Sequence, residues 1–276
     1  MESLEALQAR RYARWRQTPA SHIRDATEAA ALIDRVGLAT LYPVSTEIPN
    51  LYHAYVGDPA ASTDSKWDSP SGHVYAWRWE LGRPETAFYT ALVRKRPTWV
   101  AWALLPAVLC LCGDLRALDE LVDMRVISRD AYRVAQALET SGGALSTGEL
   151  RAAAGFPTGK EQRAAYLKAV EELDTRMLLA KVFARDGDEM SHALVSARYP
   201  QQVAAAERMS RAEALDALFA AYLPNAIYTV PSALAKDLKV PEAELRAGLD
   251  RVVAQGHAAA TELAGHKGAC YVWREG

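Results

Sequence analysis

The sequence predicts a mainly α-helical fold with small β wings, arranged as tandem winged-helix units. Residues 182–196, VFARDGDEMSHALVS, and residues 257–273, HAAATELAGHKGACYVW, each have the composition of a strand, a turn and a strand. Each of these hairpins follows three helical segments. Three helices and a two-stranded ribbon are the element order of a winged helix, and the recurrence after about eighty residues indicates a repeated unit.

The N-terminal half is predicted to contain helices, a strand and a long loop. Residues 2–17 form a helix with a cationic side, and residues 25–36 form a helix that ends at Gly37, where a left-handed cap is easy for glycine. Residues 38–44 have strand composition, and residues 57–72 are rich in Gly, Pro, Ser and Asp, which is typical of a surface loop. Four tryptophans further along are expected in the core, with stacking on a base as the alternative: Trp77, Trp79, Trp99 and Trp102.

Capping signals define the helices of the second half. Ser128 starts a helix that ends at Gly142, and Ser146 precedes Glu149 by three residues, the spacing of a capping box. The same box recurs at Ser210, and a later helix begins with proline at its first turn. We divide the chain into a basic N-terminal helix (1–19), a helical region (20–125), for which only the family resemblance given below implies a degraded winged helix, a winged helix (126–198) and a C-terminal winged helix (199–276).

Composition indicates a globular protein of two or three domains. The chain has 276 residues, of which 50% are hydrophobic. Cys110 and Cys112 lie in an apolar run, and no His or Cys pair has metal-ligand spacing, so we expect buried thiols, no metal and no cofactor. The charged N-terminus is no signal peptide, and the apolar run at 98–113 is short and contains a proline. We expect a cytoplasmic protein without a membrane span.

Residues 77–114 and 126–156 resemble the AlkZ-related proteins, which are relatives of the AlkZ and YcaQ type DNA glycosylases. The resemblance extends over about residues 20–225. It implies three tandem winged-helix units around a DNA-binding concavity and, in the enzymes of the family, excision of alkylated or crosslinked bases. Residues 20–110 are therefore expected to form a third, degraded winged helix.

The catalytic residues of those enzymes do not carry over. They have a Gln-x-Gln or Gln-x-Asp motif just after a helix end, and its side chains hold the water that attacks the glycosidic carbon. The matching stretch here, RVGLATLYPV, places Thr40 and Tyr42 at the two positions. Neither side chain can replace a carboxylate as a base. Glu47, in a loop expected at the surface, is a candidate substitute.

DNA contacts are predicted from local patches, because a net charge of -2 and a pI near 6.3 do not indicate a nucleic-acid binder in bulk. The third helix of a winged helix usually enters the major groove. In the unit at 126–198 this helix offers Lys160, Gln162, Arg163, Tyr166 and Lys168. The tyrosine either stacks on a base or lies in the core. A second cationic stretch is Arg94, Lys95 and Arg96.

The C-terminal unit has a different character. Its third helix begins with Glu242 and Glu244, which repel phosphate, so we interpret this unit as structural or as a surface for a partner. Taken together, the sequence predicts a protein that binds double-stranded DNA and has lost the catalytic motif. The alternatives are a glycosylase with altered residues and a module that mediates protein contacts only.

Overall fold

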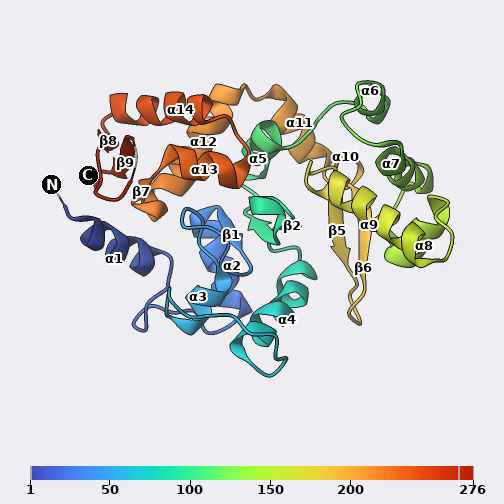
Figure 1. Ribbon diagram of the computed structural model, residues 1–276, viewed down its shortest axis with the longest axis horizontal. Helices are drawn as coiled ribbons and strands as arrows, with labels where there is room; N and C mark the ends of the chain where they lie inside the picture. Colours follow the sequence, from blue (N-terminus) through green and yellow to red (C-terminus); the bar gives the residue numbers. More distant parts are fainter. Residues whose placement is uncertain (1, 267, 276) are drawn as a thin grey trace.

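The computed structural model describes residues 2–266 and 268–275. This part of the chain is mainly helical, with small three-stranded antiparallel sheets. The predicted fold class is confirmed. Figure 1 shows the helices and strands of residues 129–194 to one side of the molecule, with the N-terminal helix and the helices of residues 211–254 on the other. No helix in the described ranges is long and apolar enough to cross a membrane.

Three stretches of the chain share one element order: helix, strand, two helices and two strands. The first unit contains α2 (Ala26–Val36), β1 (Leu38–Thr40), α3 (Leu51–Val56), α4 (Pro70–Gly82), β2 (Phe88–Thr90) and β3 (Thr98–Val100). The second contains α7 (Arg129–Ser141), β4 (Leu145–Ser146), α8 (Thr147–Ala153), α9 (Lys160–Asp174), β5 (Leu179–Phe183) and β6 (Met190–Leu194). The third contains α12 (Arg211–Ala226), β7 (Tyr228–Thr229), α13 (Pro231–Leu238), α14 (Glu242–Ala254), β8 (Ala258–Thr261) and β9 (Cys270–Trp273).

The sheets repeat as well. Their strand orders are β1-β3-β2, β4-β6-β5 and β7-β9-β8, so the last strand of each unit lies in the centre. The expectation of two-stranded ribbons was therefore incomplete, because β1, β4 and β7 each add a short strand between the first and second helix. The remaining elements are α1 (Leu4–Arg14), the 3-10 turn η1 (Val93–Lys95), α5 (Leu105–Cys112), α6 (Leu118–Asp123), α10 (Val195–Arg198) and α11 (Pro200–Arg208).

Local signals explain where the helices begin and end. The side chains of Ser146 and Ser210 accept hydrogen bonds from the backbone of Glu149 and Glu213, and both capping boxes are complete. Gly37 ends α2 with a φ of 79°. A Cβ at this position would lie 2.7 Å from the Leu104 side chain, so glycine also permits close packing against the segment that leads into α5.

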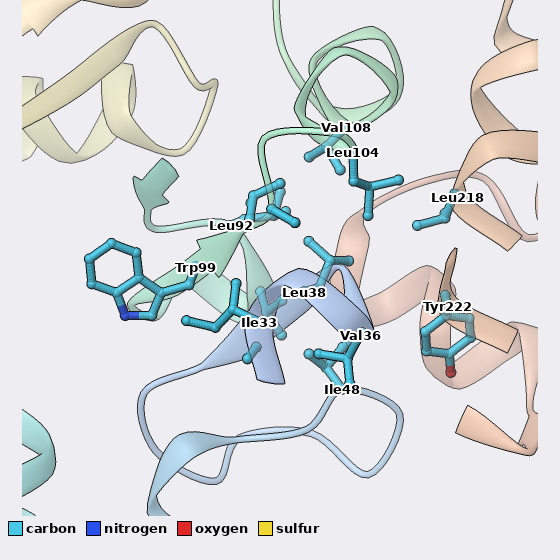
Figure 2. Close-up of a cluster of buried hydrophobic side chains, with 14 of the residues drawn as sticks. Ile33, Val36, Leu38, Ile48, Leu92, Trp99, Leu104, Val108, Leu218 and Tyr222 are labelled. Carbon is cyan, nitrogen blue, oxygen red and sulfur yellow. The ribbon is translucent and has the colours of Figure 1, made fainter. Parts of the chain in front are cut away.

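The first and third units share one hydrophobic core, whereas most of the second unit has its own. In the shared core α12 packs against both α5 and α2 (Figure 2). That figure labels core side chains from three parts of the chain. Leu104 lies just before α5 and Val108 lies within it, and Leu218 and Tyr222 belong to α12. The first unit contributes Ile33, Val36, Leu38, Ile48, Leu92 and Trp99. The second unit packs α7, α8 and α9 around Leu138, Leu150 and Leu173.

The wing of the second unit attaches it to the first. Phe183, at the end of β5, stacks on Trp99 with ring centroids 6.3 Å apart and meets Tyr89 edge-on at 5.7 Å. A Cβ on Gly82 would lie 2.2 Å from the Phe183 ring, so only glycine leaves room for it. Arg83 donates a hydrogen bond to the Gly187 carbonyl at 2.7 Å. The acidic wing tip is thus held against the end of α4.

Candidate functional site

Thr40 and Tyr42 are the two positions matched to the catalytic motif. The hydroxyl groups of both residues donate hydrogen bonds to backbone carbonyls. Thr40 is buried at the end of β1, and its hydroxyl donates to the Tyr42 carbonyl at 2.8 Å. The Tyr42 hydroxyl donates to the Ser71 carbonyl at 2.8 Å. Burial raises the pKa of Tyr42, so its phenol is neutral near pH 7. Both hydroxyl protons are committed, and neither group is a base.

Glu47 is buried, which corrects the expectation of a surface loop. Its Oε2 accepts hydrogen bonds from the hydroxyls of Tyr222, at 2.8 Å, and Thr229, at 2.9 Å. The Arg11 guanidinium lies 3.6 Å from the same oxygen. Burial, and then the charge of Glu47, hold the pKa of Tyr222 well above its usual value. Glu47 therefore faces the third unit, in a network that joins α1, α12 and β7 to the loop after β1.

Arg11 is a central residue of this network, although its sequence context predicts only a position within a cationic helix. It is buried and donates to the carbonyls of Ala226 and Thr46, each at 2.7 Å. Its guanidinium also lies 3.6 Å from the centre of the Tyr228 ring. The spacing of Leu7, Arg11 and Trp15 at four-residue intervals puts the arginine on the buried side of α1. That spacing was the available signal.

A cavity of about 500 Å³ opens beside this network. Glu47, Arg11, Asn50 and His53 are among the residues that line it. The His53 Nε2 lies 3.0 Å from the Ala61 carbonyl and its Nδ1 lies 3.1 Å from the Asn50 side-chain nitrogen, so the ring donates from Nε2 and accepts at Nδ1. Burial lowers the pKa of His53 and keeps it neutral near pH 7. The cavity has room for a polar group, but these lining groups already have partners.

Within residues 2–266 and 268–275, no three His, Cys, Asp or Glu side chains are grouped so that they could hold a metal ion.

The Arg94–Arg96 stretch forms the turn between β2 and β3. Arg94 and Lys95 both adopt positive φ, at 48° and 60°. The Arg94 Nε lies 2.5 Å from the buried Asp237 carboxylate of α13, and the Lys95 Nζ lies 2.8 Å from Glu171 of α9. Arg96 is exposed, and within the described residues it has no recorded ion pair. Of the three predicted phosphate contacts, two therefore have carboxylate partners inside the protein.

The outer face of α9 carries the other predicted contacts. Lys160, Gln162, Arg163 and Lys168 are exposed, and none of them forms a recorded side-chain hydrogen bond or ion pair in the part of the chain that the structure describes. At 3.6 residues per turn, the side chains of Lys160, Arg163 and Lys168 lie on or beside one face, together with the exposed Leu167. The contact of Lys95 with Glu171 brings the Arg94–Arg96 turn alongside the same helix.

Tyr166 is the exception among the α9 residues. Only 1% of its surface is exposed, and its ring meets Phe156 edge-on at 5.7 Å. Burial raises its pKa to about 12. The sequence left open whether Tyr166 stacks on a base or lies in the core. It lies in the core, because every third or fourth residue of α9 faces α7 and α8.

Comparison with known proteins identifies the family. The AlkZ-related family matches residues 23–236. The chain belongs to this family. The resemblance seen in the sequence is confirmed, and it extends over all three units as far as α13.

A solved structure, the Streptomyces sahachiroi DNA glycosylase AlkZ, has a similar fold. It aligns with a TM-score of 0.55 at 15% sequence identity, covering 96% of this chain and 69% of that chain. The comparison with curated proteins gives no match. The AlkZ-related chain thus has an AlkZ-like fold, in which Thr40 and Tyr42 occupy the end of β1 and the turn after it.

Proposed function

We propose that this AlkZ-related protein binds double-stranded DNA through the second unit, in a repair-related role, and does not excise bases by the route of its enzyme relatives. The observation that carries the proposal is the outer face of α9, where Lys160, Arg163 and Lys168 have no carboxylate partner among the described residues. Long cationic side chains left in solvent release the counterions of DNA when they meet phosphates, which favours binding.

The position of α9 supports the proposal. As the third helix of a winged-helix unit it is the element that usually enters the major groove. Its N-terminus begins at Lys160, so the helix dipole adds to the attraction for a phosphate. Gln162, near the same end, is an amide that can hydrogen-bond to the edge of an adenine. Arg96, exposed on the neighbouring turn, extends the cationic surface.

The absence of the family's chemistry is supported by the hydrogen bonds at β1. Hydrolysis at a glycosidic carbon needs a held water and an acceptor for its proton, and general-base catalysis typically contributes roughly a hundredfold to ten-thousandfold. The hydroxyls of Thr40 and Tyr42 donate to the carbonyls of Tyr42 and Ser71 instead. They leave the proton of an attacking water without a base.

A glycosylase with altered residues is the second candidate, because the Glu47 carboxylate lines a cavity of about 500 Å³. Its contacts favour a structural role. The Arg11 guanidinium lies 3.6 Å from its Oε2, and the hydroxyls of Tyr222 and Thr229 donate hydrogen bonds to the same oxygen, so this oxygen already has partners inside the protein. A cytoplasmic setting is also part of the proposal and is supported by the free thiols of Cys110, Cys112 and Cys270.

Two assays on the intact chain test the proposal. In a titration with duplex DNA over a range of salt concentrations, log affinity falls linearly with log salt. Incubation with DNA that contains methylated purines yields no abasic sites above a heat-treated control. Abasic sites that disappear in Thr40→Ala or Tyr42→Phe establish the enzyme instead. Failure to bind duplex DNA at any salt concentration leaves the protein-contact alternative.

A further inference from the structure

Three aromatic rings and an arginine form a group along α4, in which Trp67 is exposed and Tyr75, Arg78 and Trp79 are half-buried. Trp67, in the loop before the helix, is 69% exposed. Its ring centroid lies 5.5 Å from that of Tyr75, which in turn lies 5.7 Å from that of Trp79. The Arg78 guanidinium sits 3.5 Å from the centre of the Tyr75 ring and 4.5 Å from that of Trp79. We call Trp67, Tyr75, Arg78 and Trp79 the aromatic platform.

The loop holds Trp67 in place although its side chain is exposed. The Asp64 carboxylate accepts hydrogen bonds from the Lys66 backbone, at 2.9 Å, and from the Ser69 hydroxyl, at 2.5 Å. Gly72 lets the loop approach α4, because a Cβ there would lie 1.9 Å from the Trp67 carbonyl oxygen. The indole is therefore presented on a fixed backbone, which lowers the entropy lost when a ligand stacks on it.

The aromatic platform adjoins the position of the family's catalytic motif. A cavity of about 240 Å³ is lined by Trp67 and Tyr75 together with Tyr42 and Lys66. Arg78 also interacts with Tyr89, whose ring meets Phe183 of the second unit's wing at 5.7 Å. The platform is thus connected on one side to the end of β1 and on the other to the unit that carries α9.

The charges at the aromatic platform favour a neutral planar ligand over a phosphate. Lys66 and Arg78 are balanced by Asp64 and Asp68 in the same loop and helix. A patch with balanced charge and an exposed indole gains little from an anion, whereas every nucleobase has a face that can stack on an aromatic side chain.

We propose that the aromatic platform is a stacking site for an unpaired nucleobase of bound DNA, with the base resting on Trp67 and reaching toward Tyr42. This inference rests on the proposed DNA binding. It adds a preference that the cationic face of α9 does not provide, since α9 contacts the backbone of any duplex. Bases that are already unpaired are the favoured ligands, because a paired base must first be unstacked.

The test compares a fully paired duplex with the same duplex carrying one unpaired thymine, measured by fluorescence anisotropy. Trp67→Ala weakens binding to the bulged duplex by about tenfold, within the range of one lost aromatic–base stack. The affinity of the Trp67→Ala variant for the paired duplex stays at the wild-type value. The slope of log affinity against log salt is also unchanged for both duplexes, because no ionic contact is lost. Trp67→Phe restores most of the binding, since a smaller ring still stacks.

Met124→Ala is the matched control, because Met124 is 58% exposed and lies at the end of α6, away from the platform. It leaves both affinities unchanged. Equal binding of the two duplexes by the wild type, or a bulged-duplex affinity that Trp67→Ala does not change, overturns the stacking site while duplex binding stands. If the wild type binds neither duplex, the proposed function and the stacking site both fall.

Discussion

The second and third units have the same element order and the same strand order, but their third helices differ in charge. On α9 the cations Lys160, Arg163 and Lys168 have no recorded ion pair among the described residues. On α14 the first-turn carboxylates are paired, Glu242 with Arg246 at 2.6 Å and Glu244 with Arg211 at 2.7 Å. The fold sets where a helix lies, and the side chains on its outer face decide whether it attracts phosphate.

The two units also differ in how they join the first. The third unit is tied to it by charged groups, with Arg11 between Glu47 and the carbonyls of α12 and β7, and Asp237 bonded to Arg94. The second unit is joined through its wing, where Phe183 packs against aromatic rings, and keeps a core of its own. This difference fits a third unit that supports the scaffold and a second unit that presents a surface.

Replacing Arg11 by alanine is expected to give the largest loss of stability. It leaves the Glu47 carboxylate and several backbone carbonyls buried without their partner, which typically destabilises a protein by about 3–5 kcal/mol. Arg10→Ala is the matched control, because Arg10 pairs with Glu2 and Glu275 in partly exposed positions and such pairs contribute about 1 kcal/mol or less. Denaturant unfolding measures both. Equal losses would contradict a supporting role for the buried pair.

Acid is expected to weaken the second unit more than the third. Burial, and then the charge of Lys181, lower the pKa of His192 to about 3. His192 is paired with Leu145 in the second sheet. The equivalent pair in the third sheet is Val272 with Tyr228, so Val272 occupies the position of His192. Because the unfolded histidine binds a proton below about pH 6.5 and the folded one does not, stability falls as the pH drops from 6.5 toward 3, by about 3 kcal/mol at pH 4.

Urea unfolding at pH 7 and pH 4 measures this effect. His192→Val, which introduces the residue of the third unit, should lose about 3 kcal/mol less than the wild type over the same change in pH. Acidification also protonates carboxylates in both proteins, so the difference between them is the informative quantity. An identical loss in the two proteins would show that His192 does not distinguish the units in acid.

The sequence predicted the features that depend on neighbouring residues. The capping boxes at Ser146 and Ser210 and the hairpin at 182–196 follow from local composition. The strands β4 and β7 were missed, because two residues are too short to show a period of two.

The features that depend on distant residues were not predictable in the same way. Glu47 is buried because it meets Arg11 and Tyr222, and no local pattern brings these residues together. Asp237, as the partner of Arg94, is a contact of the same kind. Trp67 lies in a segment whose composition predicts only a loop, and its exposure follows from the hydrogen bonds that fix that loop on α4.

The most direct test of the account is the salt dependence of duplex binding in the α9 variant Lys160→Ala, Arg163→Ala, Lys168→Ala. We expect affinity to fall uniformly across sequences and the slope of log affinity against log salt to decrease by about one unit for each lost contact. A control with the same change in net charge replaces three exposed cations that have no recorded ion pair in the described ranges, Arg24, Arg125 and Lys236. The control should keep the wild-type slope. Equal slopes in the wild type, the α9 variant and the control would contradict the assignment of DNA binding to α9.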